Sequence, residues 1–206
     1  MKVKLMTIFL VSICSFGQSP EQYFKEGKMQ FDSANYKDAI ISYTNSYDLS
    51  VIKKNKKIES KSLASRGLAK SEIKDFKGAI EDYDKSLLIE SNNPNVYFLK
   101  SICLVEISDY EKAIITITKA LELDKVNSLY FLFRAGLKEN INEFKGAIID
   151  CLDVIKIDQK EGNAYAIMGR CKQKLGYSKF EVCLDFKNGI ELGDQECKEG
   201  FKKNCR

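Results

Sequence analysis

Residues 75–90 read DFKGAIEDYDKSLLIE, and two later stretches follow the same pattern: DYEKAIITITKALELD at 109–124 and EFKGAIIDCLDVIKID at 143–158. An aromatic residue, an alanine and an isoleucine recur in all three at a constant spacing of 34 residues. Self-similarity at a fixed period indicates a repeat architecture. The residues that mark the register are Phe76, Tyr110 and Phe144, then Ala79, Ala113 and Ala147, then Ile80, Ile114 and Ile148.

Two further copies extend the pattern toward both ends of the chain. NYKDAIISYTNSYDLS begins at Asn35, and a degenerate copy, KFEVCLDFKNGIELG, covers 179–193. The pattern resembles the tetratricopeptide repeat (TPR), a 34-residue helix–turn–helix unit. The resemblance covers about 20–193 and implies an all-α fold, a right-handed α-solenoid of about five units. The units begin near Pro20, Ser60, Pro94, Ser128 and Gly162.

The ends of the units and of the array have their own features. Both prolines fall at the first position of a first helix, where a missing N–H is tolerated. Six extra residues near 50–59 separate the first two units, and we expect them to lengthen the preceding helix or its turn. The fifth unit departs from the pattern around 177–181. Because solenoids need a polar terminal cap, we predict a capping helix and tail at 194–206.

The composition narrows the class of protein. The chain has 206 residues, a formal net charge of +4 and no histidine. Without histidine, Ser-His-Asp and Cys-His catalysis and histidine-ligated metal sites are excluded. There is no close Cys-x-x-Cys pair, so we expect no metal and no other cofactor. The small net charge argues against a nucleic-acid partner. We also expect that the protein is not an enzyme.

The N-terminal segment 1–17, MKVKLMTIFLVSICSFG, is typical of a secretory signal. Lys2 and Lys4 precede a short apolar run, and small residues stand before a cleavage point at Gln18. A lipoprotein signal through Cys14 is the alternative, but Ile13 precedes it where a small residue is expected. We therefore predict export from a bacterial cytoplasm to the periplasm or the medium. The run is too short to span a bilayer, and we expect no integral membrane span in the mature chain.

Charged residues recur in register. The second, fourth and fifth units carry lysine at position 11 and aspartate at position 23. The two helices of a unit are antiparallel, so these positions can meet across it. Threefold recurrence favours a structural ion pair over a catalytic one, contributing roughly 0–1 kcal/mol if exposed. The predicted groups are Lys70–Asp82 with Arg66, Lys138–Asp150 with Arg134, and Lys172–Asp185.

The resemblance also implies a binding surface, because first-helix positions 2, 5, 9, 12 and 13 line a concave groove in TPR arrays. Here these positions are apolar in the middle of the array and basic toward its C-terminal end. Neighbouring helices could cover some of them, but contiguous exposed apolar surface marks interaction sites. Carboxylate-clamp TPR domains carry lysine at position 5 and asparagine at position 9, and neither is present. We expect an extended apolar peptide or a protein face as partner. The predicted groove residues are Phe24, Lys28, Phe31, Leu68, Phe98, Ile102, Val105, Leu129, Leu132, Arg170 and Lys174.

Six cysteines follow the predicted signal. Exported proteins meet oxidising conditions, which favour disulfides. Cys183 lies ten residues before Gly193 and Cys205 twelve after it, so an antiparallel hairpin brings them to the same level. Cys197 is roughly 9 Å out of level at 1.5 Å per residue. We predict a Cys183–Cys205 disulfide that holds the capping helix.

Two functions fit these features. The first is an exported, non-enzymatic scaffold or adaptor that binds a segment of another protein in the concave groove. The second is a structural subunit of a cell-envelope complex that uses its convex face or its ends. An enzyme is the third possibility, but no nucleophile–base pair or glycine-rich phosphate loop supports it.

Overall fold

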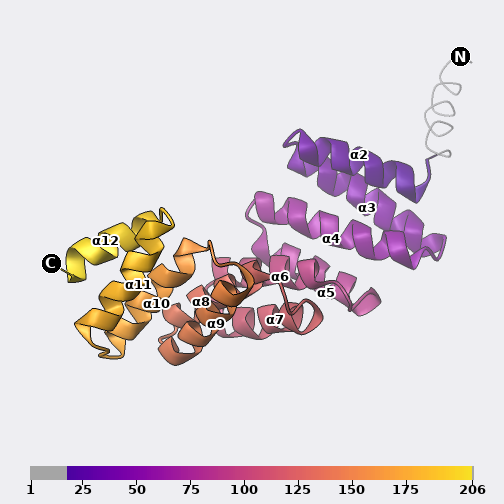
Figure 1. Cartoon of the computed structure of the whole chain (residues 1–206). Helices are drawn as coiled ribbons and strands as arrows, with labels where there is room; N and C mark the ends of the chain where they lie inside the picture. The colour runs from indigo at the N-terminus through magenta and orange to yellow at the C-terminus, as the bar shows by residue number, and fades with distance from the viewer. Residues whose placement is uncertain (1–17, 206) are drawn as a thin grey trace, which may run out of the picture. The chain divides into compact units, whose positions relative to one another are not determined.

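The computed structural model describes residues 18–205, and the predicted signal segment lies outside them. Across this part of the chain there are eleven helices and no strand, which confirms the all-α prediction (Figure 1). Successive helices pair into hairpins through short turns. The hairpins form two compact units, one ending at Asn92 and the other beginning at Asn93.

Unit 1 contains two hairpins. Helix α2 (Pro20–Asp32) pairs with α3 (Tyr36–Ile52), and α4 (Lys56–Glu72) pairs with α5 (Phe76–Ile89). Helix α4 packs against both α3 and α2, so the two hairpins share one core. The side chain of Ser19 accepts a hydrogen bond from the Gln22 N–H and starts α2 directly at its proline. This proline, like the one that begins α6, stands where the sequence placed it.

The six extra residues lie mostly in helices. Helices α3 and α4 have 17 residues each, whereas α5 has 14 and α2 has 13. The sequence led us to expect a longer α3 or a longer turn, but α4 takes the larger share and begins at Lys56. Asn55 makes this early start possible, because its side chain accepts a hydrogen bond from the Ile58 N–H at 3.2 Å. The short connection leaves Lys54 in the left-handed region with φ 56°.

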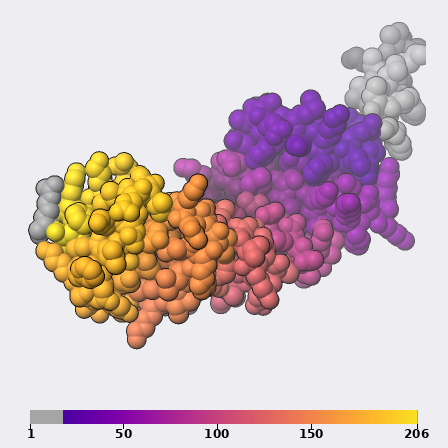
Figure 2. All heavy atoms as spheres, viewed as in Figure 1, coloured from indigo at the N-terminus to yellow at the C-terminus, as the bar shows by residue number. Residues whose placement is uncertain are grey.

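Unit 2 contains three hairpins and a terminal helix (Figure 1). In the space-filling view its C-terminal residues, in yellow, lie beside the orange residues that precede them (Figure 2). Neighbouring helices pack on one another, and the terminal helix packs on the last hairpin. The helices are α6 (Pro94–Glu106), α7 (Tyr110–Leu123), α8 (Ser128–Asn140), α9 (Phe144–Ile157), α10 (Gly162–Lys174), α11 (Lys179–Glu191) and α12 (Gln195–Asn204).

The hairpin cores combine small residues with rings. A Cβ atom at Gly27 would lie 2.8 Å from the ring of Tyr43, and one at Gly169 would lie 2.8 Å from the ring of Phe186. Only glycine lets the rings approach the first helix so closely. In the last hairpin Val182 is buried in place of the recurring alanine, because the turn at 175–178 has one residue more than the other hairpin turns. The recurring alanines are fully buried: Ala39, Ala79, Ala113 and Ala147.

Candidate partner-binding surface

Asp82 of α5 is the centre of a buried ion cluster and is 1% exposed. Arg66 of α4 holds it with two parallel hydrogen bonds, Nε to Oδ2 at 2.8 Å and Nη2 to Oδ1 at 2.6 Å. Lys70 Nζ lies 2.7 Å from Oδ2. The paired fork geometry fixes the arginine in one orientation. The cluster therefore ties the two helices of the hairpin together.

The same arginine also reaches the preceding hairpin. Arg66 Nη1 donates to Thr44 Oγ1 of α3 at 3.1 Å, while that hydroxyl donates its own proton to the Ile40 carbonyl at 2.7 Å. Unit 2 repeats this arrangement atom for atom, with Arg134 bridging Asp150 of α9 and Thr118 of α7. Sequence reasoning missed both threonines. The signal was present, since each stands at position 25 of the unit before an arginine at position 7.

Asp185 shows what the arginine contributes. It is buried at the equivalent position of α11, but its hairpin has Met168 in place of arginine, and Lys172 Nζ lies 2.8 Å from its Oδ2. Burial raises the pKa of Asp185, and the lysine offsets this only in part. Burial also acts to raise the pKa of Asp82, but there the arginine and lysine together outweigh it and hold that pKa below its usual value. These clusters join the two helices of a hairpin, and their arginine and lysine side chains are already paired with buried carboxylates.

In unit 1 the predicted groove residues partly pack on the core. Phe24 lies against Tyr43 with ring centroids 5.5 Å apart, and Phe31 lies against Tyr36 at 5.3 Å. Both phenylalanines and Leu68 are half-buried, and Lys28 is exposed. We refer to Phe24, Lys28, Phe31 and Leu68 as the unit 1 surface.

In unit 2 the predicted groove residues come from α6, α8 and α10. Phe98 contacts two rings of α8, Tyr130 at 5.1 Å and Phe133 at 5.3 Å between centroids. Leu129 is the most open apolar member, with 52% of its surface exposed. Its neighbours in the set are half-buried, apart from the exposed lysine. We call this set the unit 2 surface: Phe98, Ile102, Val105, Leu129, Leu132, Arg170 and Lys174.

Arg170 of the unit 2 surface is already ion-paired. Its Nε and Nη2 donate to the Glu139 carboxylate of α8 at 2.7 and 2.8 Å, and its Nη1 donates to Glu196 of α12 at 2.7 Å. Hydrogen bonding to Glu139 is the main reason that the pKa of Arg170 is raised. The basic end expected from the sequence is therefore largely neutralised. An open cavity of about 750 Å³ surrounds the group. It is lined by Glu139, Arg170, Gln173, Lys174, Phe186, Glu196, Glu199, Gly200, Lys203 and Asn204.

A disulfide joins Cys183 of α11 to Cys205, the residue that ends α12. The other cysteines in the described part of the chain are buried thiols. Burial raises the pKa of Cys103 to about 11 and that of Cys171 to about 12, so neither is a reactive thiolate at neutral pH. Within residues 18–205 no cluster of three or more acidic or cysteine side chains could hold a metal ion.

A second set of apolar residues lies on the second helices of unit 2. Ile115 of α7, Ile149 of α9 and Leu184 of α11 are exposed and occupy equivalent repeat positions. Ile149 is 59% exposed. We call these three residues the second-helix stripe. Exposed single aliphatic residues are common, but recurrence at one repeat position makes a continuous surface possible.

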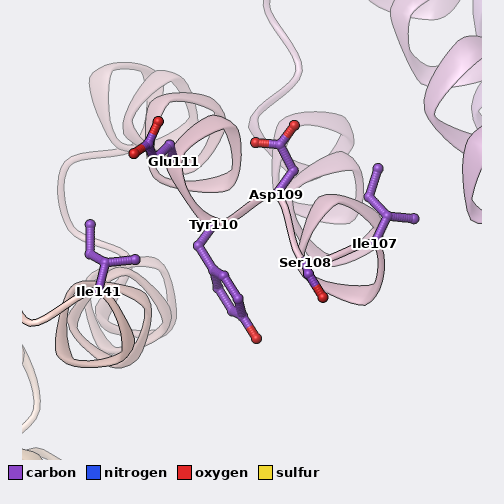
Figure 3. A pocket seen from close by; sticks show the side chains of 6 residues that line it. All are labelled: Ile107, Ser108, Asp109, Tyr110, Glu111 and Ile141. Carbon is purple, nitrogen blue, oxygen red and sulfur yellow. The ribbon is translucent and has the colours of Figure 1, made fainter.

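A hollow of about 470 Å³ lies beside the α6–α7 turn, and Figure 3 shows the six side chains that line it. Tyr110 lies between this turn and the helix end that carries Ile141. Two carboxylates line the hollow, and one of them, that of Asp109, caps α7 by accepting a hydrogen bond from the Lys112 N–H at 3.2 Å. The hollow holds no buried charged group, so we assign it no role.

Comparison with known proteins extends the sequence result. Residues 94–127, which contain α6 and α7, match the family model described as tetratricopeptide repeat. No curated protein matches the chain. A crystal structure of MamA protein is 19% identical with a TM-score of 0.75, covering 91% of this chain and 96% of that one. YrrB, described as "a TPR protein with an unusual peptide-binding site", is 14% identical with a TM-score of 0.78, covering 95% and 97%.

The fold is that of a TPR solenoid. A third structure, MamA from Desulfovibrio magneticus RS-1, agrees at 15% identity and a TM-score of 0.74, covering 86% of this chain and 96% of that one. At these identities the likeness establishes the fold alone. No helix in residues 18–205 combines the length and the apolar character needed to cross a membrane.

Proposed function

We propose that the protein is a non-enzymatic scaffold that binds a segment of another protein on the first-helix faces of its repeats. The observation that carries this is the chemistry of the unit 2 surface. Its aliphatic residues are half-buried or exposed. By contrast, Arg134 and Arg170 on the same helices already form ion pairs with carboxylates of this chain. Such a surface favours an uncharged, apolar segment over nucleic acid or an acidic peptide. The likeness to YrrB, with its peptide-binding site, is in keeping with this partner class.

The proposal includes export, with the segment 1–17 removed before Gln18. The Cys183–Cys205 disulfide supports it, because such bonds persist in oxidising compartments. Fractionation of the native cell followed by N-terminal sequencing tests it. Recovery outside the cytoplasm with Gln18 first supports cleavage, and a lipid-modified Cys14 supports the lipoprotein alternative. An intact N-terminus in the cytoplasmic fraction contradicts both.

A second candidate function is that of a structural envelope subunit that binds through its outer helices. The second-helix stripe favours it, because aliphatic residues recur there at one repeat position. The two functions differ in which surface must stay apolar. The α8–α9 hairpin carries a matched pair for this comparison, since Leu129 is 52% exposed and Ile149 is 59% exposed.

The experiment is affinity capture of partners from an envelope fraction with the mature chain as bait. Leu129→Glu and Ile149→Glu each place a charge at an exposed site, so both variants should keep their thermal stability. Loss of the stoichiometric partner with Leu129→Glu alone supports the scaffold function. Loss with Ile149→Glu alone supports the structural one. Retention by both variants contradicts both.

A further inference from the structure

Helix α12 is the shortest helix of unit 2, with 10 residues. Its contacts are to α10 and α11, and Cys197 is its one buried residue. Helices of this length are marginal in water without tertiary support. The element most able to detach from the described part of unit 2 is therefore also the one that carries a disulfide.

Helix α12 covers apolar residues of the last hairpin. A Cβ atom at Gly200 would lie 2.5 Å from the ring of Phe186, so the backbone of α12 lies directly on that ring. Phe186 and Ala166 are fully buried and belong to the same apolar cluster as Cys197 of α12. Ala166 stands at a first-helix position that lines the groove in TPR arrays, so α12 occupies part of that face. The helix also supplies half of the residues that line the 750 Å³ cavity around Arg170.

The ion pair and the side-chain hydrogen bond that join the charged and amide groups of α12 to α10 are both exposed. Glu196 pairs with Arg170 but is 63% exposed, and exposed ion pairs contribute little. The hydrogen bond from Gln173 to Asn204 is also exposed. Apart from the buried Cys197 thiol and the half-buried Phe201, the disulfide is the main restraint at the C-terminal end of α12.

We infer that the Cys183–Cys205 disulfide is a redox latch. In the oxidised protein it holds α12 over the α10–α11 hairpin and completes the cavity. After reduction by a dithiol, α12 detaches while α6 to α9 stay folded, which uncovers Phe186 and Ala166. The latch stands on its own, whereas any effect on partner binding rests on the proposed function.

The chemistry is a thiol–disulfide exchange. A reductant thiolate attacks one sulfur, the Cys183–Cys205 bond breaks, a mixed disulfide forms, and the released cysteine takes a proton. The second thiol of the reductant then displaces the other cysteine and closes the reductant's own disulfide. Two electrons and two protons pass from the dithiol to the cysteine pair. Both cysteines are only half-buried, so the bond is open to attack.

Opening follows from the loss of the cross-link. The two cysteines are 22 residues apart, and a disulfide that closes a loop of this size favours the closed state by roughly 100-fold. Hydrogen exchange of the full chain, read by mass spectrometry with and without dithiothreitol, measures this directly. We expect protection of amides in α12 to fall by roughly 100-fold. Protection in α6 to α9 should not change.

Two results would overturn the latch. One is unchanged protection of α12 in protein whose mass shows the gain of two hydrogens. The other is an equal loss of protection across α6 to α9, which would make the disulfide a staple for the whole unit. The matched control is the double variant Cys183→Ser with Cys205→Ser. Its α12 amides should exchange at the rate of the reduced protein, and dithiothreitol should not change that rate. The readout needs no partner, so it is independent of the scaffold proposal.

Discussion

Replacing Arg66 with methionine tests how the buried clusters stabilise the hairpins. The change gives the second hairpin the residue that the fifth has at Met168. Arg66 makes two hydrogen bonds to the Asp82 carboxylate and one to Thr44, and Lys70 would remain as the only cation. Hydrogen bonds to charged groups contribute about 1.5–3 kcal/mol each, and breaking a buried ion pair costs about 3–5 kcal/mol. With the lysine retained, we expect a loss of about 3 kcal/mol at pH 7.

The loss should depend on pH in a defined direction. The pKa of Asp82 is lowered in the folded protein, so this carboxylate adds stability above its unfolded pKa of about 3.9. That contribution disappears as pH falls through the folded pKa. In Arg66→Met, only Lys70 remains to offset the effect of burial on Asp82. We therefore expect the pKa of Asp82 to rise, as burial raises that of Asp185. The difference between variant and wild type is therefore largest at neutral pH and shrinks below about pH 4.

Urea unfolding followed by circular dichroism at pH 7 and at pH 3 measures both effects, with the slope checked for constancy. Lys112→Met is the control, because its ion pair with Asp109 lies on the surface. That variant should match the wild type. A cost for Arg66→Met no larger than for Lys112→Met, or one equal at both pH values, would refute the reasoning.

Three further outcomes follow from the packing. Gly67→Ala should lower stability by about 1–3 kcal/mol in thermal unfolding, since its Cβ would lie 2.9 Å from the Tyr83 ring. Gly136→Ala is the matched variant, because no atom lies within 4 Å of the added Cβ, and it should raise stability by about 1 kcal/mol. Met168→Arg should lower the pKa of Asp185 in an NMR titration. Because the raised pKa of this carboxyl disfavours folding as pH rises through it, the gain in stability should appear at neutral pH and vanish in acid. Alkylation of native protein at pH 8 should leave four buried thiols unmodified, while urea exposes them: Cys103, Cys151, Cys171 and Cys197.

Local packing explains why the hairpins could be predicted. Three of the hairpins bury a first-helix glycine against a ring of their own second helix, as Gly27 does against Tyr43, so the pattern within 34 residues carries the information. The pairing of lysine with aspartate inside one hairpin could be predicted for the same reason. Thr44 and Thr118 were missed although they recur at position 25, because the signal joins two different units and a hydroxyl on a helix surface gains its role only from the arginine of the next hairpin.

The sequence by itself determined the repeat register and the helical hairpins, since each depends on spacing along one chain segment. Only the tertiary structure decided which charges on the unit 1 and unit 2 surfaces remain available. Arg170 reads as a basic end of a groove, yet Glu139 and Glu196 reach it from α8 and α12, 31 and 26 residues away. Ala166, which the register places on the predicted groove, likewise shares an apolar cluster with Cys197 of α12. The physical reason is that electrostatic pairing and burial depend on distances in space, and no acidic residue recurs in the other units at the position of Glu139, while Glu196 lies in the terminal helix beyond the last unit.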